Sequence, residues 1–293
     1  MAKVLITGFN SFVGRNFMHL SSNRDVKEIS LFDIKPEEIK FNGYDVVIHV
    51  VAIVHQSTKI PESEYSWINR DLCLSVANSA KKAGVKQFIF LSTIKVYGRF
   101  VPETGAWNEF SKCMPEDSYG KSKYEAELEL RKMVSKDFIV SIIRTPLVYG
   151  AGVKANMLSI LKLVDRFPIL PLAKINNKRS FTSAENLVAF IDRIIERRVS
   201  GVFIAKDENP LSTTELVNHI SKYMNKRVIL FRMPKFIIRI GTALAPKIFD
   251  RLFGSFDLDN KATLQALGFR PPFTTDQGIE KMVLAYMASE MES

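Results

Sequence analysis

The stretch VLITGFNSFVGRN, residues 4–16, joins a short apolar run to a helical pattern through a turn that contains Gly8 and Gly14. Glycine lets the backbone approach a phosphate group closely, and the amide groups at the start of a helix attract negative charge. A strand, a glycine-containing turn and a helix, in this order, are the setting of a dinucleotide-binding turn. An ordinary tight turn is the alternative, so the assignment depends on the motifs that follow.

Apolar runs rich in Val, Ile and Phe recur along the chain, and helical patterns separate several of them. Continuous runs of this length are typical of strands that are buried on both faces. Strands that alternate with helices predict a parallel sheet with right-handed connections. We therefore expect an α/β fold with a Rossmann-type doubly wound parallel sheet. The expected strands are 3–7, 28–34, 44–52, 85–93, 138–146 and 200–207. The clearest helical patterns are 67–84, 212–226 and the start of 156–172, which stops being helical at its prolines.

An acidic residue, Asp33, ends the second expected strand. A carboxylate at this place accepts hydrogen bonds from the ribose hydroxyl groups of an adenine dinucleotide. It would repel the 2′-phosphate of NADP, so we expect NAD as the cofactor. Lys35 lies close enough to Asp33 to leave NADP open as the alternative.

A tyrosine and a lysine stand four residues apart in SYGKSKYEAE, residues 118–127, which places Tyr119 and Lys123 on one helix face. A free tyrosine has a pKa of about 10. A nearby ammonium group lowers that pKa, so the phenol can exchange a proton with an alcohol. Ser92 and Thr93, at the end of an expected strand, offer a hydroxyl group for the same substrate oxygen. A solvated helix face is the alternative, but the glycine turn and the hydroxyl group favour a catalytic site.

These motifs together resemble the extended short-chain dehydrogenases/reductases, a family of epimerases, dehydratases and ketoreductases that act on nucleotide sugars. The likeness covers nearly the whole chain, and it is closest to capsular and O-antigen enzymes that act at C4 of UDP-sugars. The similar motifs are TGFNSFVG (7–14), HVVA (49–52), LSTIKVYG (91–98), YGKSK (119–123), RTPLVYG (144–150) and INNKRS (175–180).

The resemblance implies a role for each residue of the catalytic motifs. Tyr119 would donate or accept the proton, Lys123 would tune the phenol and hold the nicotinamide ribose, and Thr93 would bind the substrate oxygen. Hydride would pass between a sugar carbon and the nicotinamide. The cofactor-binding residues that the resemblance implies are Gly8, Asn10, Ser11, Phe12, Val13, Gly14, Asp33, Ile34, Val51, Ala52, Asn69, Tyr119, Lys123, Thr145 and Pro146.

Three departures from the family pattern bear on these expectations. Ser11 replaces the middle glycine of the turn, which can alter the affinity for the cofactor. The segment 35–44 is short, so we expect the third strand of the family to be trimmed or absent. Leu147 replaces the usual substrate-contacting asparagine, so that contact must come from elsewhere or be missing.

The resemblance also implies how the chain is divided. A dinucleotide-binding Rossmann domain would comprise 1–150, and a small C-terminal substrate-binding lobe would comprise mainly 151–293, with about 179–205 returning to the Rossmann domain. Such lobes bind the diphosphate of the nucleotide sugar, and arginine suits that task because its planar guanidinium can bind phosphate in a bidentate manner. A solvated side chain is the alternative for each lobe residue. The implied substrate-binding residues are Thr93, Tyr119, Asn156, Arg179 and Arg251.

The favoured reaction is the reduction of a UDP-2-acetamido-2,6-dideoxy-4-hexulose, used for polysaccharide precursors. The departure at Ser11 and the short lobe favour this reaction, because a reductase must release its oxidised cofactor. A UDP-hexose or UDP-N-acetylhexosamine 4-epimerase is the alternative, since it uses the same hydride and proton chemistry. A non-catalytic dinucleotide sensor and a structural scaffold are weaker alternatives, because the tyrosine–lysine pair is intact.

The composition fits a globular enzyme, since 46% of the 293 residues are hydrophobic and 25% are charged. The formal net charge is +10, but Lys and Arg are spread along the chain, so we expect no nucleic-acid partner. The two cysteines and four histidines lack ligand spacing, so we expect no metal site and a reduced, cytoplasmic setting. The first residues lack the apolar run of a signal peptide.

The stretch FRMPKFIIRIGTALAPKIFDRLFG, residues 231–254, alternates apolar residues with Arg and Lys at roughly helical spacing. Such a stripe more often packs on the core of its own protein. It can also make weak contact with an anionic membrane. A homodimer formed through helices beside the sheet is a further expectation that comes from the family resemblance alone.

Overall fold

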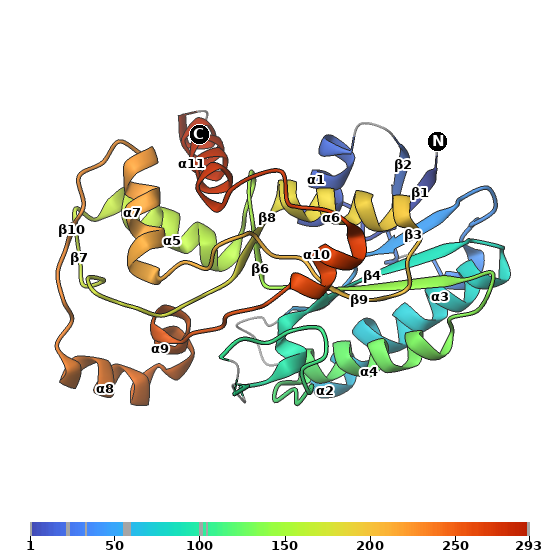
Figure 1. The fold of residues 1–293 in the computed structure, drawn as a ribbon, viewed down its shortest axis with the longest axis horizontal. Helices are drawn as coiled ribbons and strands as arrows, with labels where there is room; N and C mark the ends of the chain where they lie inside the picture. The colour runs from blue at the N-terminus through green and yellow to red at the C-terminus, as the bar shows by residue number, and fades with distance from the viewer. Residues whose placement is uncertain are drawn as a thin grey trace. The chain divides into compact units, whose positions relative to one another are not determined.

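The computed structural model describes residues 2–21, 24–32, 34–54, 60–99, 102–103 and 105–291. Asp33, the residue expected at the adenosine ribose, lies outside the described residues. Contacts divide the chain into two compact units (Figure 1). Unit 1 consists of Met1–Pro146, Leu187–Ala205 and Asp259–Arg270, and unit 2 consists of Leu147–Asn186, Lys206–Leu258 and Pro271–Ser293. Residues 187–205 of unit 1 lie within the range of about 179–205 that we expect to return to the Rossmann domain. Residues 259–270 also belong to unit 1, whereas the sequence predicts them as part of the C-terminal lobe.

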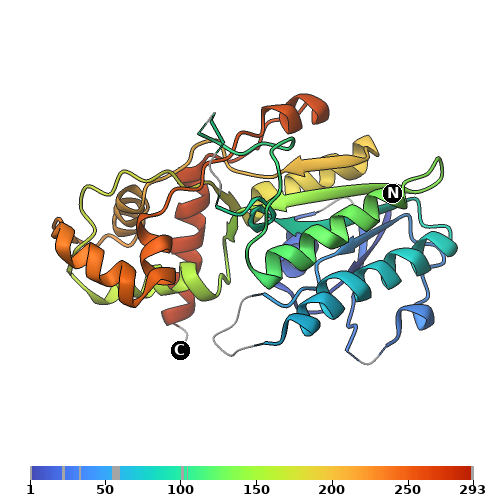
Figure 2. The ribbon, with the colours of Figure 1, turned by 90° about the horizontal axis from the view of Figure 1, so that it is seen from below.

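Unit 1 is built on a parallel six-stranded sheet with the order β2-β1-β3-β4-β5-β9. Figure 1 shows α1 (Phe12–Leu20) and α6 (Ala184–Arg197) on one face of the sheet and α3 (Leu72–Lys82) and α4 (Ser118–Lys132) on the other. Figure 2 shows α3 and α4 side by side from below. This arrangement confirms the expected α/β fold of Rossmann type. The strands are β1 (Lys3–Thr7), β2 (Asp25–Ile29), β3 (Val46–His49), β4 (Gln87–Thr93), β5 (Ile139–Thr145) and β9 (Gly201–Ile204).

The second strand lies earlier in the chain than expected. The sequence predicted residues 28–34, whereas β2 runs from Asp25 to Ile29. β2 pairs with β1 from Lys3 to Thr7, so both strands end at the glycine turn. The amides of Gly8 and Phe9 then donate to the carbonyl of Ile29, at 3.0 and 3.1 Å, which ends the pairing.

The segment between β2 and β3 is short and carries one 3-10 helix, η1 (Pro36–Glu38). The described residues between Ile29 and Val46 form no strand. The expectation that the third strand of the family is trimmed or absent is therefore confirmed for the described residues.

The helical pattern at 67–84 begins with a π-helical turn, η2 (Trp67–Asp71), which follows α2 (Glu62–Ser66) directly. The helix continues as α3 and ends before Gly84, whose φ of +85° is a left-handed conformation that favours glycine. Single π-turns inside helices often occur at functional sites. The periodicity of apolar residues could not predict this turn, because the helix keeps its buried face through α3.

Unit 2 contains mainly helices around an apolar core that includes Leu161, Val217 and Met282. The expected helix at 212–226 is α7, which begins at Ser212 with the reciprocal capping bonds to Glu215 that the sequence predicts. No helix in the described part of the chain is long and apolar enough to cross a membrane. The helices are α5 (Ala155–Arg166), α7 (Thr213–Tyr223), α8 (Lys235–Leu244), α9 (Pro246–Phe253) and α11 (Thr275–Met291), and the short strand pairs are β6 (Leu147–Tyr149) with β8 (Phe181–Ser183) and β7 (Ile169–Leu170) with β10 (Ile229–Leu230).

Unit 2 contains a buried carboxylate, Asp207, that accepts several hydrogen bonds. It accepts hydrogen bonds from the Tyr149 hydroxyl at 2.6 Å and from the Asn186 amide at 2.7 Å, and also from the backbone amide of Ser183 at 3.0 Å. Burial raises the pKa of Asp207, and these donors act in the opposite direction. Since the donors satisfy the carboxylate, we assign it a structural role.

Candidate active site

The carboxyl ends of the parallel strands meet at one edge of the sheet, and most of the expected site residues of unit 1 lie there. Gly8 follows β1, and Val51 and Ala52 follow β3. Thr93 ends β4 and lies opposite Thr145 in the register of β4 and β5. In open α/β sheets, ligands bind at this edge.

Helix α4 starts against the segment that follows β4. The side chain of Asp117 caps the helix by accepting a bond from the Gly120 amide at 2.7 Å. A Cβ atom at Gly120 would lie 2.7 Å from the carbonyl oxygen of Lys95, in the 3-10 helix η3 (Ile94–Tyr97). Only glycine permits this close approach of α4 to η3.

The phenol of Tyr119 is protonated at neutral pH in this structure. Burial raises its pKa to about 12, a hydrogen bond with Thr93 acts in the opposite direction, and Asp117 raises it further. The sequence-based expectation of a lowered pKa is therefore wrong for this structure, because burial outweighs the stabilisation of the phenolate. A phenol with a raised pKa is suited to donate a proton to an oxygen atom that becomes negatively charged.

Lys123 lies one turn further along α4 and is only 1% exposed. Its Nζ atom lies 4.0 Å from the centre of the Phe90 ring. Burial lowers its pKa to about 8, whereas Cys73 and Glu127 act in the opposite direction. Among the described residues, this Nζ has no hydrogen-bond partner. Because a buried donor without a partner is rare, a ligand with hydroxyl groups, such as the nicotinamide ribose, fits this place.

A buried ion pair lies one further turn along the same face of α4. Glu127 accepts from Arg144 of β5, with Nη2 at 2.6 Å and Nε at 3.1 Å, and from the Ser92 hydroxyl at 2.5 Å. The Arg144 guanidinium also lies 4.8 Å from the centre of the Tyr97 ring. The sequence analysis missed this pair. The sequence feature that could have pointed to Glu127 is its position four residues after Lys123, on the same helix face.

Side chains engage two backbone amides of the glycine turn. The Ser11 hydroxyl caps α1 by accepting from the Gly14 amide at 3.0 Å, and the Glu28 carboxylate accepts from the Asn10 amide at 3.2 Å. A Cβ atom at Gly8, whose φ is +132°, would lie 2.7 Å from a methyl group of Val50. The turn therefore has the close packing of a dinucleotide-binding turn, and a bound pyrophosphate would compete with Ser11 for the Gly14 amide.

Asn69 supports the loop that follows β3. Its side chain accepts from the Ile53 amide at 2.8 Å and donates to the Ile53 carbonyl at 3.1 Å. The same amide group donates to the Ser122 hydroxyl of α4 at 3.0 Å. The π-turn η2 carries this side chain and thereby links the loop to the catalytic helix. Direct binding of a cofactor by Asn69 stays a prediction.

The remaining cofactor residues differ in exposure. Thr145 and Pro146 are buried at the end of β5, and the Thr145 hydroxyl donates to the Ser92 carbonyl at 3.4 Å. Ile34 is exposed, while Phe12 and Val13 are partly exposed in the first turn of α1. Their roles stay predictions, as does the role of Asp33.

The three expected lobe residues lie close together in unit 2. Arg251 of α9 donates to the Asn156 side chain of α5 at 2.7 Å. Arg179 donates to the backbone carbonyls of Asp250 and Gly254, at 3.1 and 3.0 Å, where α9 ends. Burial lowers the pKa of Arg179, Asp250 opposes this shift, and Arg251 adds to it. Guanidinium groups suit the binding of a diphosphate, and this role of Arg179 and Arg251 stays a prediction.

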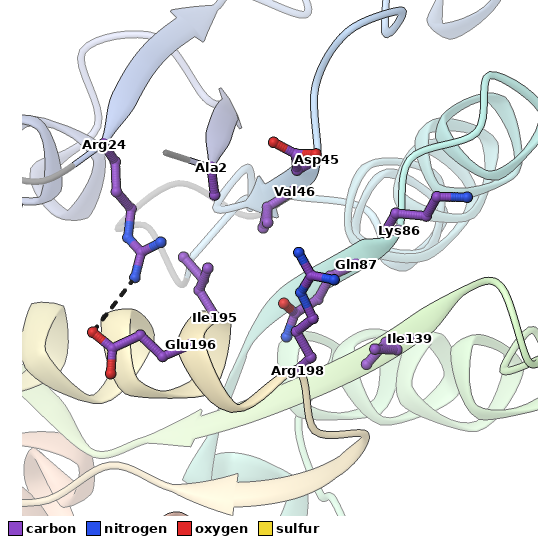
Figure 3. Close-up of a pocket in the computed structure, with 10 residues that line it drawn as sticks. All are labelled: Ala2, Arg24, Asp45, Val46, Lys86, Gln87, Ile139, Ile195, Glu196 and Arg198. Carbon is purple, nitrogen blue, oxygen red and sulfur yellow. Dashed lines mark ion pairs between the residues drawn. The ribbon is translucent and has the colours of Figure 1, made fainter.

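A hollow of about 170 Å³ lies at the opposite edge of the sheet, at the amino ends of the strands. Figure 3 shows Gln87, Arg198 and an Arg24–Glu196 ion pair in its lining. The two charged groups of this pair are 3.9 Å apart. The tyrosine–lysine pair is at the other end of the strands. We therefore expect the chemistry at the carboxyl edge, where Tyr119 and Lys123 lie, and not in this hollow.

Comparisons with known proteins agree with this geometry. The model of the NAD dependent epimerase/dehydratase family matches residues 4–204. A UDP-glucose 4-epimerase from Vibrio cholerae is 31% identical, and the alignment covers 97% of this chain and 95% of that protein. An N-acetyl-alpha-D-glucosaminyl-diphospho-ditrans,octacis-undecaprenol 4-epimerase from Escherichia coli O157:H7 is 24% identical, over 95% and 93% of the two chains.

Solved structures show the same fold. A UDP-glucuronic acid 4-epimerase from Bacillus cereus, in complex with NAD, has a TM-score of 0.78 at 16% identity and covers 99% of this chain and 98% of its own. A dTDP-4-dehydrorhamnose reductase from Bacillus anthracis, in complex with NADP, has a TM-score of 0.76 at 18% identity, over 97% and 99%.

The chain therefore belongs to the NAD-dependent epimerase/dehydratase family. This result confirms the resemblance to the extended short-chain dehydrogenases/reductases. The members of this family are NAD(P)-dependent enzymes, and the known relatives are epimerases, dehydratases and reductases of sugar nucleotides.

Proposed function

We propose that this protein catalyses hydride transfer between a nicotinamide cofactor and C4 of a UDP-sugar. One observation carries the proposal: the buried Lys123 ammonium group has no hydrogen-bond partner among the described residues, and it lies one helical turn from the Tyr119 phenol, whose pKa the Thr93 side chain lowers. This is the arrangement that a sugar hydroxyl and a ribose would complete. The neighbouring guanidinium groups of Arg179 and Arg251 support a diphosphate substrate.

The side chains divide the work at the reacting oxygen. Thr93 and Tyr119 would both hydrogen-bond O4 of the sugar, which orients C4. The Lys123 ammonium would donate to the ribose hydroxyls and stabilise negative charge that develops on the phenol oxygen. Tyr119 would give a proton to O4 during reduction and take one from O4 during oxidation. When it is bound, the nicotinamide supplies or accepts the hydride.

Reduction of a UDP-2-acetamido-2,6-dideoxy-4-hexulose is the reaction that we favour. A reductase must exchange its cofactor in every turnover. The Gly14 amide donates to the Ser11 hydroxyl and is therefore not free to donate to a pyrophosphate. This contact would lower the affinity of the protein for its cofactor. We propose NAD as the cofactor because of Asp33, with NADP as the alternative.

C4 epimerisation of a UDP-hexose or a UDP-N-acetylhexosamine is the second candidate. The relative from Vibrio cholerae supports it, because that protein is a UDP-glucose 4-epimerase with 31% identity over nearly the whole chain. The relative from Escherichia coli O157:H7 extends the substrate class to sugars whose diphosphate is linked to a prenyl lipid. A cytoplasmic location and a homodimer stay predictions.

The first experiment separates the two reactions. We would incubate the purified protein with UDP-N-acetylglucosamine, UDP-glucose and their galacto epimers, first without added cofactor and then with NAD. Interconversion at C4 without net use of cofactor would establish an epimerase. Oxidation of NADH or NADPH only in the presence of a 4-keto-6-deoxy UDP-sugar would establish a reductase. The absence of both reactions would refute the proposal.

The variant Tyr119→Phe tests the site itself. We expect turnover to fall by at least about a hundredfold, because the proton donor is lost, while the cofactor still binds. Tyr124→Phe, on the same helix, is the matched control and should keep the turnover. Wild-type turnover in Tyr119→Phe would remove Tyr119 from the mechanism.

A further inference from the structure

Helix α8 exposes apolar side chains along one side. Phe236, Ile237, Ile240 and Leu244 are 65%, 41%, 54% and 81% exposed. The helical period places these four residues within one stripe. Ile248, in the following helix α9, is 56% exposed. These five residues form what we call the α8–α9 face.

The inner sides of the two helices pack against each other. A Cβ atom at Gly241 would overlap the ring of Phe249, so the ring fills the place where a side chain would be. The Phe249 ring stacks on Phe253, with the ring centres 5.5 Å apart. The sequence left open whether this stretch packs on the protein or faces a membrane. The inner side packs, and the α8–α9 face remains exposed.

The surrounding segment is strongly basic. Residues 226–254 contain one acidic residue, Asp250, and the exposed Arg232 and Arg239 lie on the two sides of Phe236 in sequence. Exposed apolar residues with flanking cations are typical of helices that lie in the interface of an anionic bilayer. The cations of this segment are Lys226, Arg227, Arg232, Lys235, Arg239, Lys247 and Arg251.

We propose that the α8–α9 face binds the surface of a membrane that contains anionic lipids, with its apolar side chains between the headgroups. A second copy of the chain fits this face less well. A two-fold dimer would place the same basic segment on both sides of the interface, and like charges would repel. Anionic headgroups offer the opposite charge to the exposed Arg227, Arg232 and Arg239.

The face belongs to the same unit as the expected diphosphate site. α9 carries both Ile248, which is part of the face, and Arg251, which is hydrogen-bonded to Asn156. Membrane binding through this face would therefore hold Asn156, Arg179 and Arg251, the proposed diphosphate site, near the lipid headgroups. This inference goes beyond the proposed function and does not depend on it.

Co-sedimentation with vesicles tests the proposal. We would compare vesicles of phosphatidylcholine alone with vesicles that also contain phosphatidylglycerol, for the wild type and for Ile240→Glu/Leu244→Glu. We expect the wild type to bind the anionic vesicles at least about tenfold more tightly than the neutral ones. The double variant should lose at least about tenfold of that affinity. Leu284→Glu, at another exposed apolar position in α11, should bind like the wild type.

Two further measurements keep the result unambiguous. Thermal unfolding shows whether the double variant is folded, and the milder variant Leu244→Gln replaces it if it is not. Light scattering reports the oligomeric state of both proteins. Equal sedimentation of the wild type and the variants, or no binding of the wild type, would refute the proposal. A wild-type dimer that the variant converts to a monomer would assign the face to a second copy and also refute it.

Discussion

Lys123 is a buried lysine whose position lowers the stability of the folded protein. Its ammonium group is buried, it lies on an aromatic ring, and the described part of the chain gives it no hydrogen-bond partner. Burial without a partner disfavours the charged form, which is why the pKa falls to about 8. The folded protein is therefore less stable than it would be with an apolar side chain of the same shape.

The variant Lys123→Met should raise the free energy of unfolding at about pH 7 by roughly 1–3 kcal/mol, while turnover is lost. Methionine keeps the volume and the contact with the Phe90 ring, and it removes the buried charge. Urea unfolding measures the change. Lys132→Met, at the exposed end of α4, is the control and should leave the stability nearly unchanged.

The pH dependence of this difference has a definite sign. The folded-state pKa of Lys123, about 8, lies below its usual value of 10.5. Below about pH 8 the lysine is charged in both states, and the penalty on folding is fully present. As the pH rises from 8 to 10.5, the unfolded state binds more protons, so the stability of the wild type rises. The advantage of Lys123→Met should shrink over this range, and a constant advantage would contradict the assignment.

At this scale the sequence predicted the catalytic residues but not their protonation. The spacing placed Tyr119 and Lys123 on one face of a helix, since residues four apart share a face, and the family resemblance added Thr93. Their catalytic roles stay predictions. It could not predict that burial raises the pKa of Tyr119, because burial depends on which strands α4 covers. The pattern of glycines in the sequence could likewise not predict that the Ser11 hydroxyl accepts a hydrogen bond from the Gly14 amide.

At the scale of elements, the Glu127–Arg144 pair joins the catalytic helix to the sheet. Both side chains are buried, and their shortest contact is 2.6 Å. A buried pair of this kind is weak evidence for added stability, but the loss of one partner leaves an uncompensated charge. The pair therefore ties α4, which carries Tyr119 and Lys123, to β5 of the sheet.

Glu127→Leu should lower the free energy of unfolding by about 3–5 kcal/mol, because it leaves the Arg144 guanidinium buried and unpaired. Adding Arg144→Met should restore most of this loss, because both charges are then removed. Urea unfolding of the two variants gives the comparison, and Glu129→Leu in an exposed ion pair is the control. If the double variant is less stable than Glu127→Leu, the interpretation of the pair is wrong.

The elements themselves were predicted well where the apolar runs were long. β1, β4 and β5 fall within the expected strands, because buried parallel strands read as continuous Val, Ile and Phe. β2 was placed wrongly, since its register is set by pairing with β1 and not by its own composition. The sequence also gave no sign of the π-turn that carries Asn69.

At the scale of the molecule, the residues that we propose for the cofactor and those that we propose for the diphosphate belong to different units. The glycine turn and α4 belong to unit 1, whereas Asn156, Arg179 and Arg251 belong to unit 2. Sequence patterns could name these arginines only through the family resemblance. Only the folded structure shows that Arg251 lies beside Asn156, because the two residues are 95 positions apart in the chain.

Arg251→Met should weaken the binding of UDP by at least about tenfold and leave the affinity for NAD unchanged. The reason is that the guanidinium contributes charge to the diphosphate site of unit 2 and is no part of the glycine turn. Titration calorimetry with UDP and with NAD measures both affinities. Lys178→Met, an exposed cation one residue before Arg179, is the control. An unchanged affinity for UDP would place the diphosphate elsewhere.

The division into units also constrains how the protein can be made. The chain changes unit after residues 146, 186, 205, 258 and 270, which is five crossings. During synthesis on the ribosome, β5 therefore remains an unpaired sheet edge until residues 201–204 emerge and form β9. Unit 1 is complete only once residue 270 has been made. Neither unit can be cut out as one continuous fragment, and a nascent chain must wait for its last residues before it can finish folding.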